Sequence, residues 1–372
     1  MQSKKQIIKC KIVRYSHDDA AEMQQSLRFG EVILNAIPEE IIRYESPLNK
    51  DQIKYKIRFT TPFGESFTTQ PKSLDKIVSD PKIRSLTYKP RTAEESLNAI
   101  LNGAQRAQRV SVVRQIETPG FYYIDGKIVA SNITMHQSSS GEIKRCAEFL
   151  NELVARSKHP EILVTLIKWG ILGPFSFVFK QLSEEGSERW LPWLYLNGHT
   201  KTSKTTDGTL VLSIYTKQKN KLSLAIADNV ARLGAAISHE TFPKLIDEAR
   251  LDPKMQSGLI EAIKHAVQGQ TARTKLSITS EPIDIPALCA CIFTSNYQLP
   301  SDPALRRRFL NYYYPKDDKP TEDEIREFQS FLKSGRDSLG TLGDFAINHI
   351  LSNQELITND RIVWQTIGQA IL

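Results

Sequence analysis

Residues 193–206 read WLYLNGHTKTSKTT, and this stretch decides how the rest of the chain is interpreted. Its first four residues are apolar, and we expect them to form a short buried strand. Gly198 then opens a turn of small and polar residues. Lys204 and Thr205 follow at a position where a helix can begin. The stretch therefore predicts a strand, a loop and a helix in direct succession.

The loop follows the spacing G-x-x-x-x-G-K-[ST], which is typical of loops that bind phosphate. In such a loop, successive backbone N–H groups point at the phosphates, and the helix that follows adds the positive end of its dipole. We expect Lys204 to reach the β- and γ-phosphates and the Thr205 hydroxyl to hold Mg²⁺. The residues predicted to bind the nucleotide are Gly198, Thr202, Ser203, Lys204, Thr205 and Thr206.

One position departs from this pattern, because Ser203 stands where a second glycine is usual. Glycine suits that position since the backbone passes close to phosphate, often with a positive φ. Serine is small enough to fit, but the match is weaker. On this motif alone, a Lys-Thr pair that follows a strand by chance is the alternative.

The 372 residues suffice for two or three domains, and the apolar and charged contents are ordinary for a globular chain. A net charge of +7 suits an acidic partner such as nucleic acid, although a mildly basic soluble protein has the same composition. The four cysteines form no zinc spacing and are expected to be free thiols of a reducing compartment. Neither a signal peptide nor an apolar run of about 18 residues is evident, so we expect an intracellular protein with no membrane partner.

The order of the expected elements suggests four regions. Residues 1–137 are expected to form a small α+β domain, and a serine-rich linker at 138–141 leads into a helical segment that extends to 185. Residues 186–315 alternate strands with helices, which indicates an α/β fold: a parallel sheet with helices on both faces. Residues 316–372 are expected to form a helical lid. The apolar residues near the C-terminus are unusual at the end of a domain and suggest a piece of a longer polypeptide.

In the first region, Tyr122 and Tyr123 precede an Asp-Gly pair at 125–126. That pair predicts a tight hairpin turn. Exposed tyrosines on such a hairpin could stack on bases. A place in the core is the more frequent role of aromatic residues on a strand.

Two carboxylates end an apolar stretch at Leu245-Ile246-Asp247-Glu248. At the end of a strand, Asp247 could support Mg²⁺ and Glu248 could orient or deprotonate an attacking water. The alternative is an acidic helix start, since Asp and Glu favour that position. Lys244 within this strand is unexpected, because a central strand of a parallel sheet is apolar on both faces.

Two further polar groups follow apolar strands. Asn296 ends the buried run 292–296, where its amide could contact the γ-phosphate or the attacking water; a simple turn residue is the alternative. A short helix at 303–308 then carries three arginines. An arginine presented to a neighbour's phosphates stabilises charge in the transition state, whereas a basic surface patch is the plain alternative.

The spacing of these motifs supports reading them together. About forty residues separate Lys204 from Asp247, and about fifty separate Asp247 from Asn296, which leaves room for the intervening helices and strands. Each motif falls at the carboxyl end of an expected strand, where open α/β sheets bind their ligands. We therefore predict a nucleotide-binding domain with a phosphate-binding loop.

With these motifs, the chain resembles the AAA+ ATPases over about residues 186–315. The resemblance rests on the loop at 198–205, the Asp247-Glu248 pair, Asn296 as the first sensor and the arginine run at 306–308. Within that group, the chain looks most like superfamily 3 and related primase–helicase ATPase domains of plasmids and viruses, including archaeal mobile elements. This finer likeness rests on residues 229–234, on Phe242-Pro243, and on a short hairpin before Asn296.

The resemblance implies ATP and Mg²⁺ as cofactors and a homo-oligomer, usually a hexameric ring, that acts on single-stranded or forked DNA. It implies that Asp247 supports the metal, Glu248 activates water and Asn296 senses the γ-phosphate. It further implies that Arg307 or Arg308 reaches the site of the neighbouring subunit.

In such families a hairpin before the first sensor projects into the pore and contacts DNA. By resemblance this hairpin maps to about residues 270–279, with Arg273 and Lys275 on DNA phosphates. An ordinary exposed turn is the alternative for these two residues. In the lid, Arg336 and Arg361 are candidates for a second sensor.

Three functions are therefore open at the level of sequence. The first is an ATP-hydrolysing ring motor on DNA, such as the replicative helicase of a mobile element. The second is an ATP-dependent initiator, loader or remodelling ATPase that does not unwind DNA. The third is a structural DNA-binding module with a decayed site, which Ser203 and Lys244 could indicate.

Overall fold

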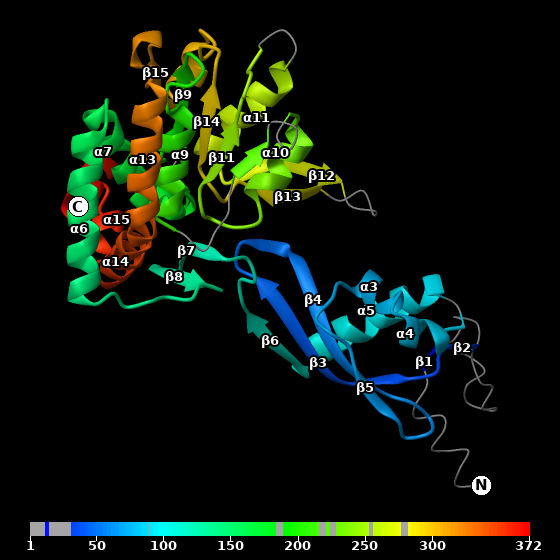
Figure 1. The fold of residues 1–372 in the computed structure, drawn as a ribbon. Helices are drawn as coiled ribbons and strands as arrows, with labels where there is room; N and C mark the ends of the chain where they lie inside the picture. Colours follow the sequence, from blue (N-terminus) through cyan, green and yellow to red (C-terminus); the bar gives the residue numbers. More distant parts are fainter. Residues whose placement is uncertain are drawn as a thin grey trace, which may run out of the picture. The chain divides into compact units, whose positions relative to one another are not determined.

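The structure is a computed structural model, and it describes residues 12–14, 31–88, 90–183, 189–215, 221–223, 228–252, 256–276 and 282–372. The chain divides into two compact units, Met1–Glu117 and Thr118–Leu372 (Figure 1). The first unit thus ends before the expected boundary at residue 137. The reason is that Phe121 and Ile128, in the hairpin that follows, are buried in the core of the second unit.

The first unit is built on a four-stranded sheet of order β5-β4-β3-β6, in which β4 is antiparallel to β3 and β5, and β6 is parallel to β3. Helices α3, α4 and α5 pack on one face of this sheet, where Ile57, Phe59 and Leu97 are fully buried. A small separate sheet pairs β1 with β2. The bounds of these elements are β1 Ile12–Arg14, β2 Glu31–Leu34, β3 Ile37–Ser46, β4 Asn49–Thr60, β5 Ser66–Thr68, β6 Val110–Arg114, α3 Leu74–Val78, α4 Pro81–Ser85 and α5 Pro90–Arg106.

The second unit opens with the predicted hairpin, formed by β7 (Gly120–Ile124) and β8 (Lys127–Ser131). Asp125 and Gly126 both have positive φ, 49° and 81°, as a tight hairpin turn requires. Tyr122 is fully buried, and its hydroxyl donates to the Thr118 carbonyl oxygen at 3.0 Å. The alternative in which Tyr122 belongs to the core is therefore confirmed, and base stacking by this residue is excluded.

Helices α6 (Ser140–Arg156), α7 (Pro160–Leu172) and α8 (Ser176–Leu182) follow, with the 3-10 turn η1 (Gly173–Phe175) between the last two. The prediction of a linker at 138–141 is wrong. Ser139 caps α6 by accepting a hydrogen bond from the Glu142 backbone N–H, while the Glu142 carboxylate accepts from the Ser139 N–H at 2.8 Å. The serine-rich stretch is thus a helix start.

A five-stranded parallel sheet of order β10-β11-β14-β9-β15 forms the centre of the second unit. Leu245 and Ile292 on one face of this sheet lie against α9, whereas aromatic rings stack on the opposite face. Figure 1 shows α9 on one side of the strands and α10 and α11 on the other. The bounds are β9 Trp193–Gly198, β10 Lys221–Ser223, β11 Lys244–Asp247, β14 Cys291–Ser295, β15 Phe309–Tyr314, α9 Lys204–Ser213, α10 Val230–Ile237, α11 Ser257–Gln268 and α12 Pro303–Arg306.

The alternation of strands and helices therefore gives the α/β architecture that the sequence predicts. The charge within β11 has a local explanation, because the ammonium of Lys244 pairs with the Glu240 carboxylate at 3.2 Å. Both side chains are largely buried. The attraction of a carboxylate partner offsets part of the cost of taking a cation out of water.

Two further parts complete the unit. Strands β12 (Thr271–Leu276) and β13 (Pro282–Pro286) pair as an antiparallel hairpin between α11 and β14. The C-terminal residues are helical, as expected, and Ile367 and Ile371 at the apolar end of the chain are buried. Their bounds are η3 Lys316–Asp318, α13 Glu322–Gly335, η4 Arg336–Ser338, α14 Leu339–Ser352, α15 Glu355–Thr358 and α16 Trp364–Ile371.

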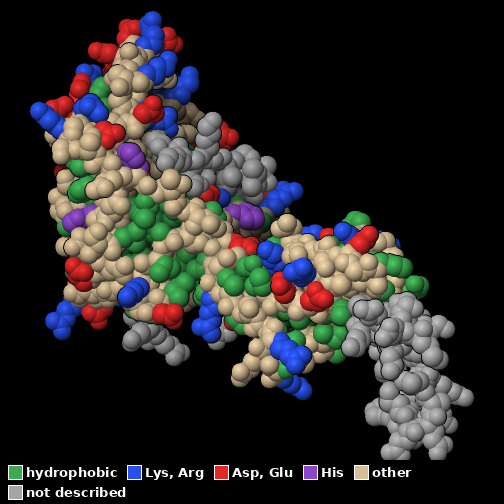
Figure 2. Space-filling view, turned by 90° about the horizontal axis from the view of Figure 1, so that it is seen from below, with side chains coloured by type: hydrophobic (Ala, Val, Ile, Leu, Met, Phe, Trp, Pro, Cys, Tyr) green, Lys and Arg blue, Asp and Glu red, His purple; other side chains and the backbone are tan. Residues whose placement is uncertain are grey.

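One helical stretch, Pro160–Leu182, has the length and apolar composition of a membrane span. Most of its apolar window, 78%, is buried inside the protein, which is typical of a core helix. On the surface seen from below, basic and acidic side chains are interspersed (Figure 2).

Lys180 connects the segment that precedes the β12–β13 hairpin to the segment that follows it. Its ammonium donates to the carbonyl oxygens of Ala266, in the last turn of α11, and Ala287, just after β13, at 2.5 and 2.8 Å. The side chain is only 2% exposed, and burial lowers its pKa to about 8. One buried ammonium therefore fixes where the hairpin leaves the α/β core.

The depressed pKa of Lys180 predicts a stability that rises at alkaline pH. Between about pH 8 and 10.5, the unfolded chain still binds a proton that the folded chain has released, so the free energy of unfolding increases with pH. From pH 7 to 9.5 we expect the wild type to gain about 2 kcal/mol relative to Lys180→Met, as measured by urea denaturation. Parallel pH courses for the two proteins would contradict this.

Candidate nucleotide-binding site

The loop after β9 begins at a glycine that no other residue can replace without distortion. Gly198 has a φ of 142°, and a Cβ at this position would lie 2.0 Å from the Tyr314 carbonyl oxygen in β15. The same carbonyl oxygen accepts a hydrogen bond from the His199 N–H at 3.2 Å. The loop therefore leaves the sheet in close contact with the end of the neighbouring strand.

Ser203, where the sequence departs from the usual pattern, has a φ of 69°. This is the left-handed conformation that glycine adopts without strain and that other residues adopt at some cost. Lys201 in the same loop also has a positive φ, 63°. The loop thus has the backbone course that the glycine pattern predicts, although serine occupies the position.

Lys204 begins α9, and its side chain folds back over the loop. The ammonium donates to the carbonyl oxygens of Gly198 (3.0 Å) and His199 and to the Thr202 hydroxyl (3.3 Å). Burial lowers the pKa of Lys204, and the nearby Asp247 carboxylate opposes this shift. A cation bound only to neutral oxygens is well placed to exchange them for an anionic ligand.

Asp247, at the end of β11, lies beside the start of α9. Its carboxylate accepts hydrogen bonds from the Thr205 hydroxyl at 2.9 Å and from the Thr294 hydroxyl. Thr294 also accepts from the Glu248 backbone N–H at 3.3 Å. Glu248 itself is exposed and has a φ of 58°, so β11 ends in a sharp turn at this residue.

These groups surround one pocket of about 280 Å³ at the carboxyl ends of β9, β11 and β14. Eight of the residues predicted from sequence line it together: Thr202, Ser203, Lys204, Thr205, Thr206, Asp247, Glu248 and Asn296. Thr294 and Ser295 line it too and were not singled out by the sequence. The signal for them was the polar run that ends β14, of which only Asn296 was chosen.

A second pocket, of about 320 Å³, adjoins the other side of the same loop. Thr202, Ser203 and Thr206 line it together with the end of α6, residues 157–159 that follow it, and the lid helix α13, including Phe328. Asp207 in its wall is buried, which raises the pKa of its carboxyl to about 6, and it accepts a hydrogen bond from the Tyr314 hydroxyl at 2.8 Å. Sequence reasoning missed this pocket, because it depends on contacts between distant elements.

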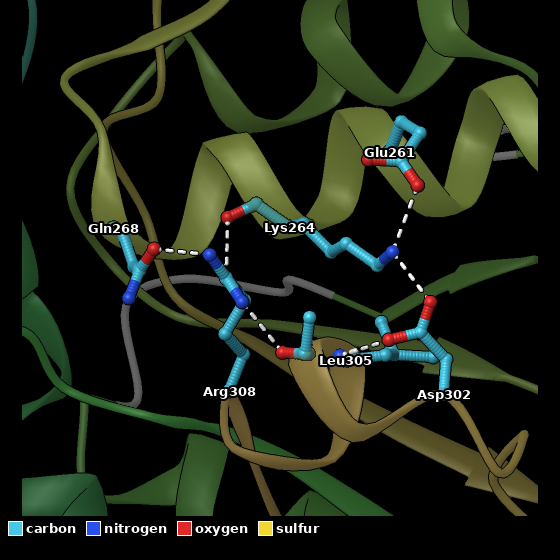
Figure 3. Close-up of polar contacts among 7 residues, drawn as sticks. Glu261, Lys264, Gln268, Asp302, Leu305 and Arg308 are labelled. Carbon is cyan, nitrogen blue, oxygen red and sulfur yellow. Dashed lines mark hydrogen bonds and ion pairs between the residues drawn. The ribbon is translucent and has the colours of Figure 1, made fainter.

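Arg308 is held inside its own chain. Its guanidinium donates to the carbonyl oxygens of Lys264 (2.9 Å) and Ala304 (2.6 Å) and to the side-chain oxygen of Gln268 (Figure 3). The Lys264 ammonium in turn bonds the carboxylates of Asp302 (2.6 Å) and Glu261 (2.8 Å). Arg308 therefore fastens the α12 turn to α11.

Arg307 is exposed, and it lines a surface pocket of about 310 Å³ beside Trp190 and Trp364. Neither Arg307 nor Arg308 lines the pocket around Lys204. Of the two arginines that the sequence offers for a neighbouring site, the exposed one is therefore better placed to reach outside the chain.

The remaining candidates lie apart from the pocket. Arg273 in β12 packs its side chain against Gly234 of α10, and its Nε has no hydrogen-bond partner among the described residues. The side chain of Lys275 and the hairpin tip at 277–281 lie outside the described residues. Arg336 donates to the Ser213 hydroxyl at 2.7 Å, at the opposite end of α9 from the phosphate loop, and Arg361 is exposed.

No family model matches the chain, and no curated protein matches its sequence. Among solved structures, the chain is similar to the active helicase Cch of SCCmec type IV at 14% identity and a TM-score of 0.47, over 89% of this chain and 64% of that one. The apo C-terminal region of NrS-1 shows 13% identity and a TM-score of 0.35, over 86% and 72% of the two chains.

A full-length MCM homolog from Methanopyrus kandleri shows 10% identity and a TM-score of 0.30, over 91% of this chain and 74% of that one. The match to the helicase Cch covers 64% of that protein, so the chain spans less than two thirds of it. At these identities and TM-scores, the similarities assign no activity to this chain.

The φ of Ser203 predicts that glycine is better tolerated there than serine. Ser203→Gly should raise the free energy of unfolding by about 0.5 to 1 kcal/mol, because it removes the strain of a Cβ in the left-handed region. Ser203→Ala keeps the Cβ and serves as the control. Urea denaturation would measure both, and equal stabilities for the two variants would show that the position is unstrained.

Proposed function

We propose that this chain is an ATP-hydrolysing enzyme of the AAA+ type. One observation carries the proposal: residues from three separate stretches of the sequence line one pocket at the carboxyl edge of a parallel sheet. They are Lys204 and Thr205, Asp247 and Glu248, and Asn296. This edge is where open α/β sheets bind nucleotides. A loop with a positive-φ backbone, a lysine and a helix start supplies the groups that triphosphates require.

In this proposal, Lys204 exchanges its loop carbonyl partners for the β- and γ-phosphate oxygens. The backbone N–H groups at the start of α9 bind the same phosphates with the help of the helix dipole. The pocket that contains Phe328 continues from the loop toward the lid, and we assign it to the base and ribose. Asp207 in its wall would then contact the nucleoside side of the ligand.

The Thr205 hydroxyl and the Asp247 carboxylate, already in contact at 2.9 Å, would hold Mg²⁺. The described residues include no group of three or more His, Cys, Asp or Glu side chains suited to a metal. This agrees with Mg²⁺, which usually uses one or two protein oxygens together with substrate phosphates and water. When bound, the metal would neutralise charge that develops on the phosphates.

Glu248 is the group we assign to the attacking water. It is exposed within the pocket, and its backbone N–H is tied to Thr294, which also bonds Asp247. Its carboxylate can therefore accept a proton from water while the metal-side carboxylate stays in place. Asn296, on the next strand end, would orient the γ-phosphate or that water.

We further propose that the enzyme works as a homo-oligomeric ring of six subunits, as is usual for the type it resembles, and moves on single-stranded or forked DNA. Arg307 would reach the neighbour's phosphates, and Arg308 would hold the α12 turn that carries it. The β12–β13 hairpin, with Arg273 and Lys275, would contact the DNA. An initiator or loader that hydrolyses ATP without unwinding DNA shares the same site.

The first test is ATP turnover with and without single-stranded DNA. Lys204→Ala and Glu248→Gln should each lower turnover by about 10²–10⁴-fold, since one removes phosphate binding and the other the base. Lys144→Ala, an exposed lysine on α6, should leave turnover unchanged. Stimulation by DNA together with strand displacement supports the motor, turnover without displacement supports the loader, and turnover that survives both site variants refutes the site.

The second test concerns Arg307. If it acts on a neighbour's site, Arg307→Ala should lower turnover by about 10³-fold or more. Mixing this variant with Lys204→Ala should restore about a quarter of wild-type turnover, because each variant supplies the group that the other lacks at randomly mixed interfaces. Arg326→Ala, an exposed arginine on α13, is the control. Failure to recover activity in the mixture would remove Arg307 from the site.

A further inference from the structure

The four-stranded sheet of the first unit has one face that its helices do not use. Side chains alternate between the two faces of a strand. Ile57 and Phe59 of β4 point into the helical core and are fully buried. Lys54, Lys56 and Arg58 occupy the alternate positions and therefore point to the opposite side. We call this side the open sheet face.

Neighbouring strands place aromatic and apolar groups among these cations. In the register of β3 with β4, Tyr44 is opposite Lys54 and Ile42 is opposite Lys56. On the other side of β3, Val113 of β6 is the partner of Tyr44 and is 36% exposed. The open sheet face thus carries a row of cations beside a row of ring and aliphatic surface.

Two of the cations already have acidic partners, but the pairs are weak. Lys54 pairs with Glu117, and Arg58 pairs with Glu40 at 3.5 Å. All four side chains are more than a third exposed. Exposed pairs of this kind contribute little stability, so a phosphate group can replace either carboxylate at small cost.

An exposed aromatic residue follows β4 in the sequence. Phe63, in the turn between β4 and β5, is 86% exposed, and the turn continues through Gly64 with a φ of 83°. A phenyl ring left in water gives up the stabilisation that burial would provide. Its position next to the strand that carries the cations makes it available for stacking.

We propose that the open sheet face binds single-stranded nucleic acid. The three cations follow one strand at every second residue, about 6.7 Å apart and about 13 Å in all, which suits the regular phosphates of a linear polyanion. Tyr44 and Phe63 supply surfaces on which bases stack. A flat sheet with basic and aromatic residues is a known solution for unpaired strands, whose bases are accessible. The residues of this face belong to the first unit, whereas those of the nucleotide pocket and of the β12–β13 hairpin belong to the second.

The test compares two variants of the full chain with equal loss of charge. The first, Lys54→Ala with Lys56→Ala and Arg58→Ala, removes the cations of the open sheet face. The second, Lys76→Ala with Arg84→Ala and Arg106→Ala, removes exposed cations from the helices of the same unit. Binding of fluorescent oligo-dT and oligo-U is measured by anisotropy, without nucleotide, at several salt concentrations.

We expect the first variant to bind at least tenfold more weakly, and its slope of log K against log salt to shrink by about 2, since each phosphate contact to a single strand contributes about 0.7. The second variant should bind like the wild type. Phe63→Ala, at a position too exposed to affect folding, should weaken binding about five- to tenfold with an unchanged salt slope. The two oligonucleotides show whether DNA or RNA is preferred.

Several results would overturn the proposal: equal losses in both triple variants, an unchanged affinity in the first, or tighter binding of duplex than of single strands. A change of oligomeric state without a change of affinity would assign the face to a second copy of the chain instead. Repeating the assay in the Lys204→Ala background separates this proposal from the proposed ATPase, because the open sheet face should bind with or without a working nucleotide site.

Discussion

The close passage of β9 against the end of β15 is the constraint on which the site depends. The Tyr314 carbonyl oxygen leaves no room for a side chain at residue 198. This residue must therefore be a glycine, at which the chain turns sharply away from the sheet. The hydroxyl of Tyr314 bonds Asp207 in the first turn of α9, and its ring lies against His159. One tyrosine thus fixes the start of the loop, the helix that follows it and the wall of the adjoining pocket.

The sequence was sufficient to predict the part of the site that depends on local order. An apolar strand followed by polar residues places those residues at the carboxyl edge of a parallel sheet, whichever strand it is. That rule brings Lys204, Asp247 and Asn296 to one edge without any knowledge of strand order. It also explains why a serine at residue 203 did not disturb the prediction, since the backbone there adopts the glycine conformation at moderate cost.

What the sequence could not reveal depends on contacts between distant elements. The role of Thr294 could not be predicted, because it depends on the pairing of β14 with β11. That pairing brings the Thr294 hydroxyl to the Asp247 carboxylate. The domain boundary at 137 failed because the hairpin at 120–131 is equally regular whichever core it joins, and only its packing assigns it to the second unit. Likewise, adjacent arginines at 307 and 308 look equivalent until Gln268 and two carbonyl groups are found to hold one of them.

The basic residues of this chain therefore have two different uses, and net charge does not distinguish them. Lys180, Arg308 and Arg336 donate hydrogen bonds to carbonyl, hydroxyl or amide oxygens of the same chain. These three side chains hold elements of the fold together. Lys54 and Arg58 instead pair with exposed carboxylates, which a phosphate can displace. A charge of +7 is thus weak support for a nucleic-acid partner by itself. The argument becomes specific only where exposed cations recur at strand spacing beside rings that a base can cover.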